Sequence, residues 1–144
     1  MKKSECPCTV KLKNSKVVVE QNKRKATFLN KERKSIFVTE VDGCLCRNEV
    51  AADFVVEKEG SGVIVVELKG RDVPHGVQQV EATAKYWVAN RGASKVAGLV
   101  VCRQRPSYST SVQRCQVRFA RAYRAPLHVV PGNKEFDFDK MIIF

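Results

Sequence analysis

AADFVVEKEGSGVIVVELKG, residues 51–70, is the stretch that decides the fold of this chain. The runs DFVV and VIVVEL are apolar and rich in β-branched side chains, so each predicts a strand. The KEGSG segment between them carries two glycines, which favour a turn that reverses the chain. A hairpin folded about Gly60 places Asp53 opposite Glu67 on the neighbouring strand.

Lys69 joins these two acids on one face of the predicted hairpin, because side chains two residues apart on a strand point the same way. A shift of one residue in register would send one strand's side chains to the other face. Two carboxylates and a lysine on the central strands of an apolar sheet are costly unless they pair or bind a metal ion. Carboxylate oxygens at this density suit Mg²⁺ or Mn²⁺, with water completing the shell. The alternative is that Lys69 pairs with an acid at the strand end and the group only stabilises the fold.

The arrangement resembles the PD-(D/E)xK nuclease superfamily, in which an acid, a turn and an E-x-K segment lie on one hairpin. Here these are Asp53, the KEGSG turn and Glu67-x-Lys69. The segment VVELKGRDVPHGVQQVEATAKYW also resembles small nuclease-like proteins whose ELKG segment leads into a helix containing a glutamine. The resemblance covers about residues 35–102.

The resemblance implies an α/β fold with a restriction-endonuclease-like core of order αβββαβ, a mixed central sheet flanked by helices. Two positions depart from the pattern of the family. Ala52 stands where the motif has a proline, a position that varies in the family. Gln79 is followed four residues later by Thr83, so the QxxxY signature of the helicase-linked branch is absent and that branch is not assigned.

The resemblance also implies a catalytic set, namely Asp53, Glu67, Lys69 and Gln79. The two carboxylates and the backbone carbonyl of Leu68 would hold Mg²⁺ or Mn²⁺, which polarises the phosphoryl oxygen and lowers the pKa of a bound water. Lys69 would orient the attacking water or stabilise charge in the transition state. Gln79 would approach the site from the polar side of the following helix.

Further polar side chains lie close to this segment in the sequence. Glu40 and Asp42 share a face of the preceding predicted strand, and either could complete the metal site. The alternative for Asp42 is ordinary turn chemistry, because Asp-Gly is a common turn pair. His75 could touch a phosphate, but a single histidine at a helix start is more often structural.

Hydrophobic periodicity extends the prediction to one domain spanning residues 1–144. Strands are predicted at residues 35–42, 51–57, 63–68, 95–102 and 127–130, and helices at residues 74–90 and 111–123. Residues 1–34 are assigned to a basic N-terminal segment, 35–102 to the core with the candidate active site, and 103–144 to an arginine-rich helix with closing strands. The alternation of strands and helices in the second half predicts parallel pairing.

The net charge of +11 indicates a polyanionic partner. Arg114, Arg118 and Arg121 follow i, i+4, i+7 spacing, which predicts one basic stripe on a helix. Like charges crowded on one helix face repel, so an external anion such as a phosphate backbone is a natural partner. The residues expected to bind nucleic acid are Arg103, Arg105, Arg114, Arg118, Arg121, Lys23, Arg24 and Lys25. The alternative is a basic surface that only confers solubility.

The cysteines include two close pairs, Cys6-x-Cys8 and Cys44-x-Cys46. Their spacing of one residue is shorter than the spacing of about two to four that is usual in structural zinc sites. No signal peptide is visible after Met1, which argues against structural disulfides. We therefore expect reduced thiols and no structural zinc.

The chain is expected to be cytoplasmic, in a host cell or encoded by a virus, and to have no membrane partner. No apolar stretch approaches the about 20 residues that a membrane span needs. The tail EFDFD, residues 135–139, alternates acidic and aromatic residues and predicts an edge strand with Phe136 and Phe138 facing inward. The apolar residues 141–144 after it could mediate a homodimer.

The leading hypothesis from the sequence is a metal-dependent endonuclease that hydrolyses phosphodiester bonds of DNA, including branched DNA such as a Holliday junction. A non-catalytic nucleic-acid-binding protein on the same fold is the alternative from a different class. An RNA-cleaving, toxin-like domain is a second enzymatic alternative. A structural subunit that meets an acidic protein through the arginine helix would show neither magnesium binding nor salt-sensitive DNA affinity.

Overall fold

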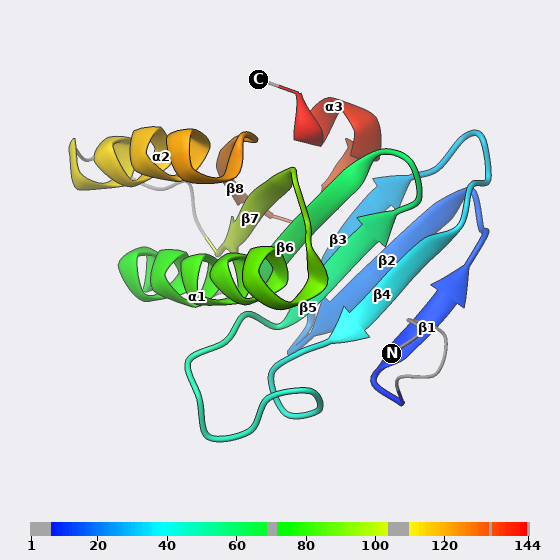
Figure 1. Cartoon of the computed structure of the whole chain (residues 1–144), viewed down its shortest axis with the longest axis horizontal. Coiled ribbons are helices and arrows are strands. Elements are labelled where there is room, and N and C mark those ends of the chain that lie inside the picture. Colours follow the sequence, from blue (N-terminus) through cyan, green and yellow to red (C-terminus); the bar gives the residue numbers. More distant parts are fainter. Residues whose placement is uncertain (1–6, 69–71, 104–109, 133, 144) are drawn as a thin grey trace.

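The computed structural model describes residues 7–68, 72–103, 110–132 and 134–143, which form two sheets and three helices (Figure 1). The strands are β1 (Thr9–Leu12), β2 (Lys16–Gln21), β3 (Arg24–Leu29), β4 (Ile36–Glu40), β5 (Phe54–Lys58), β6 (Gly62–Leu68), β7 (Val96–Cys102), β8 (Leu127–Pro131) and β9 (Glu135–Asp137). The helices are α1 (Val73–Arg91), α2 (Thr110–Tyr123) and α3 (Phe138–Ile142).

The larger sheet has six strands in the order β1-β4-β5-β6-β7-β8. Neighbours from β1 to β6 are antiparallel, whereas β6, β7 and β8 run parallel. Helices α1 and α2 cover one face of this sheet, and the smaller sheet β2-β3-β9 covers the other together with α3 (Figure 1). Strands covered on both faces read as continuous apolar runs, which is why β6 and β7 are buried along nearly their whole length.

The predicted hairpin is confirmed, with the register that a turn about Gly60 requires. Val55 pairs with Val65, and Val56 pairs with Ile64. The predicted strands and helices from residue 35 to residue 130 are each present, with ends that differ by a few residues. The parallel pairing predicted for the second half is also confirmed, in β6, β7 and β8.

Helix α1 is delimited by residues whose chemistry suits helix ends. The side chain of Asp72 accepts a hydrogen bond from the backbone N–H of His75 (3.1 Å), and Pro74 occupies the first turn. Gly92 ends the helix in the left-handed conformation at φ 67°. In the structure, His75 therefore donates a backbone hydrogen bond at the start of α1.

A close approach between layers depends on Gly98 in β7. A Cβ atom at this position would lie 2.7 Å from Leu127 Cδ1 and 2.8 Å from Val80 Cγ1. Glycine therefore lets α1 pack directly on β7, beside the part of the sheet that carries the candidate site.

The expected αβββαβ order is not confirmed, because β1, β2 and β3 occupy the N-terminal region where that order has a helix. Strand β1 joins the larger sheet beside β4, and the β2–β3 hairpin forms most of the smaller sheet. The pattern of β2 is that of a half-buried strand, since Val17 and Val19 are buried while their neighbours are exposed. The described part of residues 1–34, which begins at residue 7, therefore forms three strands of the fold and is not only a basic segment.

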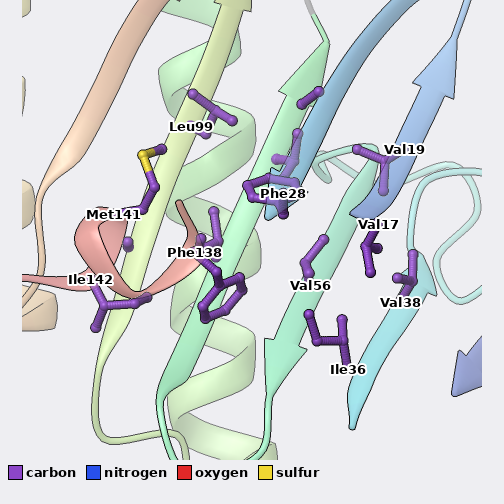
Figure 2. Close-up of a cluster of buried hydrophobic side chains, with 14 of the residues drawn as sticks. Val17, Val19, Phe28, Ile36, Val38, Val56, Leu99, Phe138, Met141 and Ile142 are labelled. Atoms are coloured by element: carbon purple, nitrogen blue, oxygen red, sulfur yellow. The ribbon is translucent and has the colours of Figure 1, made fainter. Parts of the chain in front are cut away.

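The C-terminal tail forms the predicted edge strand, β9, and then turns into the short helix α3. Phe138 is fully buried and Phe136 is partly buried, and their rings lie 6.1 Å and 6.0 Å from that of Phe28. Figure 2 shows Met141 and Ile142 of α3 within the same apolar cluster. Met141 and Ile142 thus pack into the core, whereas Ile143 is exposed and Phe144 lies outside the described residues. The homodimer stays a prediction.

The expectation of reduced thiols is wrong for two of the cysteines. Cys8 and Cys44 form a disulfide, with their Cα atoms 5.8 Å apart, which links the segment before β1 to the segment after β4. Antiparallel pairing of β1 with β4 brings these segments together, and this proximity cannot be read from residue spacing. Cys46, Cys102 and Cys115 are free thiols, and Cys6 lies outside the described residues.

Candidate active site

Asp53 and Glu67 lie side by side at one end of the larger sheet, where β5 begins and β6 ends. A carboxylate oxygen of Glu67 accepts a hydrogen bond from the backbone N–H of Asp53 (3.1 Å). A carboxylate oxygen of Asp53 accepts one from the backbone N–H of Leu68 (2.9 Å). The residues are only 5% and 3% exposed, so these bonds offset part of the cost of removing the acids from water.

Both acids belong to the face of the sheet that α1 covers. Val55 and Val65, two residues away from them along their strands, belong to the apolar cluster beneath α1. Asp53 and Glu67 therefore lie together on one face of the sheet, as the sequence predicts. Lys69, the third member of the expected set, lies outside the described residues.

Helix α1 holds the segment that leads into Asp53. The side-chain amide of Gln79 donates a hydrogen bond to the backbone carbonyl of Ala51 (3.1 Å). The hydroxyl of Thr83 accepts one from the backbone N–H of Ala52 (2.8 Å). Gln79 reaches the neighbourhood of the acids as expected, but from the buried face of α1 and not from a polar side, and there it positions the backbone before Asp53. Sequence reasoning missed Thr83, although it lies four residues after Gln79 and so shares its helix face.

Glu40 and Asp42 do not join the two acids. Glu40 pairs in register with Phe54, which pairs with Val66, so strand alternation places Glu40 on the opposite face from Glu67. Asp42 lies beyond the end of β4, and its backbone N–H bonds to the carbonyl of Ala52 (3.1 Å). Gly43 lies in the turn that follows, where its backbone N–H donates to the carbonyl of Cys46 (2.9 Å), so the Asp-Gly pair begins a turn as the alternative predicts.

The two adjacent carboxylates suit a hard divalent cation that keeps much of its water. Among the described residues, no three Asp, Glu, His or Cys side chains are grouped to hold a metal ion. Mg²⁺ is commonly bound through only one or two carboxylates, with water and substrate phosphate as further ligands. Asp53 and Glu67 are thus a suitable donor pair, and the carbonyl of Leu68 stays a predicted ligand.

Among the described residues, no cysteine belongs to a group of three or more potential metal ligands, and Cys8 and Cys44 are bonded to each other. Burial raises the pKa of the Cys102 thiol, and it likewise raises the pKa of Cys46, with Glu49 and Asp42 adding to the effect. A raised pKa lowers the fraction of each thiol that is present as the reactive thiolate. The expectation that the protein holds no structural zinc stays a prediction.

The basic residues expected to bind nucleic acid divide into two surfaces. Lys23 and Arg24, in and beside the β2–β3 turn, line a groove together with Arg103 at the end of β7. Lys25 is not among the residues that line this groove, and it pairs in register with Glu20 of β2. Arg105 lies outside the described residues.

The second surface is the outer side of α2. Arg114, Arg118 and Arg121 line one shallow hollow of about 620 Å³, so the predicted basic stripe is confirmed. Arg118 also donates a hydrogen bond to Glu81 of α1 (2.6 Å), and this bond raises the pKa of Arg118. Val117 lies among the arginines with 53% of its surface exposed.

Comparison of the chain with known protein families, curated proteins and solved structures found no match. Within the described residues, no helix has both the length and the apolar character needed to cross a membrane.

Proposed function

We propose that this chain is a metal-dependent nuclease that hydrolyses phosphodiester bonds, with DNA as its substrate. The observation that carries the proposal is the buried Asp53–Glu67 pair, located at the end of the larger sheet near the groove that Lys23, Arg24 and Arg103 line. Metal-dependent phosphodiester cleavage uses a cation near the scissile phosphate, and binding of the substrate uses further positive charge along its backbone. Adjacent carboxylates can bind the cation. Lysine and arginine side chains can supply the further positive charge.

The proposed fold relationship is to the restriction-endonuclease-like core. Strands β4, β5 and β6, helix α1 and strand β7 follow one another in the order βββαβ, and the hairpin of β5 and β6 carries the two acids. Strands β1 to β3 replace the initial helix of the αβββαβ order. We propose that this segment corresponds to the catalytic core of that superfamily.

Each residue of the site has a separate task in this proposal. Asp53 and Glu67 would hold the Mg²⁺ or Mn²⁺ ion, which supplies Lewis-acid polarisation of the phosphoryl oxygen and an activated water. Lys69 would orient that water or stabilise the developing charge. Gln79 acts as a positioning residue, because its amide fixes the carbonyl of Ala51 two residues before Asp53.

A non-catalytic nucleic-acid-binding protein is the second candidate, and the hydrogen bonds of the acids favour it. Each carboxylate accepts a backbone N–H from the other acid's strand region, so the pair also fastens the start of β5 to the end of β6. A purely structural pair would need these bonds and no metal ion.

Cleavage by isosteric variants separates the two candidates. We would assay Asp53→Asn and Glu67→Gln, which keep an oxygen acceptor for the backbone N–H groups, on plasmid, linear duplex, single strand, four-way junction and RNA with Mg²⁺ or Mn²⁺. Glu40→Gln is the matched control, because Glu40 is exposed and lies on the opposite face. We expect a loss of about 100-fold or more from each site variant and little change from the control.

The preferred substrate then distinguishes a junction resolvase, another DNA endonuclease and an RNA-cleaving domain. Thermal unfolding of each variant checks that loss of activity is not loss of folding. Salt-sensitive binding without cleavage by the wild type under either metal would instead establish the non-catalytic binder.

A further inference from the structure

Three segments that are distant in sequence line one groove at the carboxyl end of β7. The β2–β3 turn region supplies Asn22, Lys23 and Arg24, the end of β7 supplies residues 101–103, and Gly132 follows β8. The groove has a volume of about 430 Å³. Among the described residues that line it, three are cationic and none is acidic.

The backbone around the groove is fixed by a tight turn and by a bond between strand ends. Asn22 and Lys23 both adopt left-handed conformations, with φ of 52° and 65°, the pattern of a two-residue hairpin turn. On the other side, the backbone N–H of Gly132 donates to the carbonyl of Cys102 (3.1 Å). Lys23 and Arg24 therefore project from a tight hairpin, and Arg103 directly follows the last residue of β7.

The groove lies at the same end of the larger sheet as the acids. Glu67 pairs in register with Val100, and Arg103 follows three residues later, which corresponds to about 10 Å of strand rise. Glu67 faces α1, whereas Lys23 and Arg24 come from the smaller sheet on the opposite face. A ligand that contacts both sets must pass over the ends of β6 and β7.

We propose that this groove binds the phosphodiester backbone of a nucleic-acid strand and guides it across the end of the larger sheet to Asp53 and Glu67. The guiding role rests on the proposed nuclease function, whereas the affinity for the backbone rests on the residues of the groove alone. In this proposal, the groove determines the path that the substrate takes to the two acids.

The chemistry of the lining favours a chain of phosphates. Arginine presents a planar fork that matches phosphate oxygens, and lysine adds a point charge. Lys23 and Arg103 are exposed and Arg24 is half-buried, so the charges line an open groove and do not converge on one enclosed anion. Repulsion among the three cations is relieved by a ligand with several negative charges, which a nucleic-acid backbone supplies.

The test is the salt dependence of binding by the double variant Arg24→Ala, Arg103→Ala. Fluorescence anisotropy with labelled single-stranded and duplex DNA in EDTA measures binding without hydrolysis. The slope of log K against log salt should become shallower by about 1.4 for single strands and about 1.8 for duplex, as two lost phosphate contacts require. The variant Arg24→Lys, Arg103→Lys should retain the slope because the charges remain.

The double variant Lys13→Ala, Lys31→Ala is the matched surface control, because both lysines are exposed and lie before β2 and after β3, at the end away from the β2–β3 turn. An unchanged slope in a folded double alanine variant would overturn the groove proposal, whatever the result of the cleavage assay. A shallower slope in a protein that never cleaves would uphold the groove and reject the nuclease. Displacement of DNA by polyglutamate at equal charge concentration would also overturn the proposal, because it would indicate a non-specific basic surface.

Discussion

Asp53 and Glu67 each bond to the backbone of the strand that carries the other acid. These bonds lie where the regular β5–β6 pairing ends, so the acids continue the connection between the strands beyond the ladder. Side chains fixed in this way by strands are held more precisely than side chains on loops. A metal ion bound to both acids would therefore meet donors that are already arranged.

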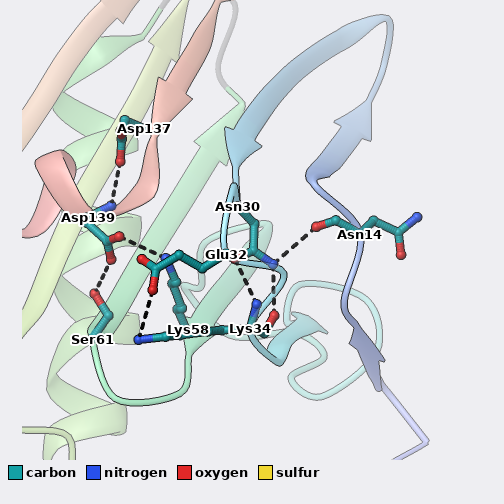
Figure 3. A network of polar contacts seen from close by, with 8 residues as sticks. All are labelled: Asn14, Asn30, Glu32, Lys34, Lys58, Ser61, Asp137 and Asp139. Atoms are coloured by element: carbon teal, nitrogen blue, oxygen red, sulfur yellow. Dashed lines mark hydrogen bonds and ion pairs between the residues drawn. The ribbon is translucent and has the colours of Figure 1, made fainter.

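Lys58 and Asp139 form a second, partly buried polar contact, distant from these acids. Lys58 Nζ donates to Asp139 Oδ2 (2.8 Å), and the hydroxyl of Ser61 donates to Oδ1 (2.7 Å), as Figure 3 shows. The Lys58 side chain is 2% exposed and that of Asp139 is 43% exposed. The contact joins α3 to the β5–β6 turn, and the hydrogen bond from Lys58 lowers the pKa of Asp139.

We expect Asp139→Asn to lower the free energy of unfolding by about 2 kcal/mol, between the values for exposed and buried ion pairs. The cost arises because the variant leaves the buried ammonium of Lys58 without a charged partner. Lys58→Met should cost less, since the carboxylate of Asp139 is accessible to water and retains Ser61. Urea denaturation at neutral pH measures both, and equal losses would contradict this asymmetry.

The same pair predicts a dependence of stability on acid. The folded pKa of Asp139 lies below its ordinary value of 3.8, so its contribution is complete above that value and is lost as pH falls through the lowered pKa. The wild type should therefore lose stability relative to Asp139→Asn as the solution is acidified below about pH 4. Parallel curves of unfolding free energy against pH for the two proteins would show that the bond does not contribute.

The elements best predicted from the sequence are those whose register is set locally. The β5–β6 hairpin follows from two β-branched runs around a glycine turn, and this placed Asp53 beside Glu67. Glu40 could not be placed on a face in the same way. The long connection of residues 41–53 separates β4 from β5, and no tight turn in it fixes their register.

The β2–β3 hairpin was missed for two physical reasons. Its strands alternate buried valines with exposed polar residues, so its apolar signal is weaker than that of the doubly covered β6. Its turn residues, Asn22 and Lys23, differ from the usual Asn-Gly pair although both have positive φ. The basic groove could therefore not be predicted from the sequence, because only the β2–β3 hairpin brings Lys23 and Arg24 close to Arg103.

At the scale of elements, the Cys8–Cys44 disulfide fastens the edge strand β1 to the sheet across 36 residues of sequence. We expect Cys8→Ser with Cys44→Ser to lower the free energy of unfolding by about 4 kcal/mol, from the loop-closure entropy restored to the unfolded chain. Denaturation under non-reducing conditions measures the loss. Cys115→Ser is the control, because it removes a free thiol and leaves the disulfide intact. No difference between double variant and wild type would mean that the bond does not form in solution.

At the scale of the whole molecule, the net charge of +11 is concentrated in part on two surfaces. The groove opens beside the smaller sheet, whereas the arginine stripe belongs to α2 on the other face of the larger sheet. Within the stripe, Arg118 is already bonded to Glu81, so Arg114 and Arg121 are the better candidates for binding the phosphates of the proposed DNA ligand. A duplex that used both surfaces would have to cover the end of the sheet.

We expect the groove variant Arg24→Ala, Arg103→Ala and the stripe variant Arg114→Ala, Arg121→Ala each to make the duplex salt slope shallower by about 1.8. If one DNA molecule contacts both surfaces, the combined variant should show the sum, about 3.6, because distant independent contacts add. If the surfaces bind DNA separately, the combined loss will fall short of that sum.

The control removes four charges elsewhere, by replacing Lys13, Lys31, Lys85 and Lys140 with alanine, all of which are exposed. It lowers the net charge as much as the combined variant does, so net charge alone predicts equal slopes for the two proteins. Specific contacts predict a nearly unchanged slope for the control, because counterion release counts the phosphates that are contacted rather than the total charge. An equal loss in both would mean that neither surface directs the DNA, and that the protein binds polyanions only through its overall charge.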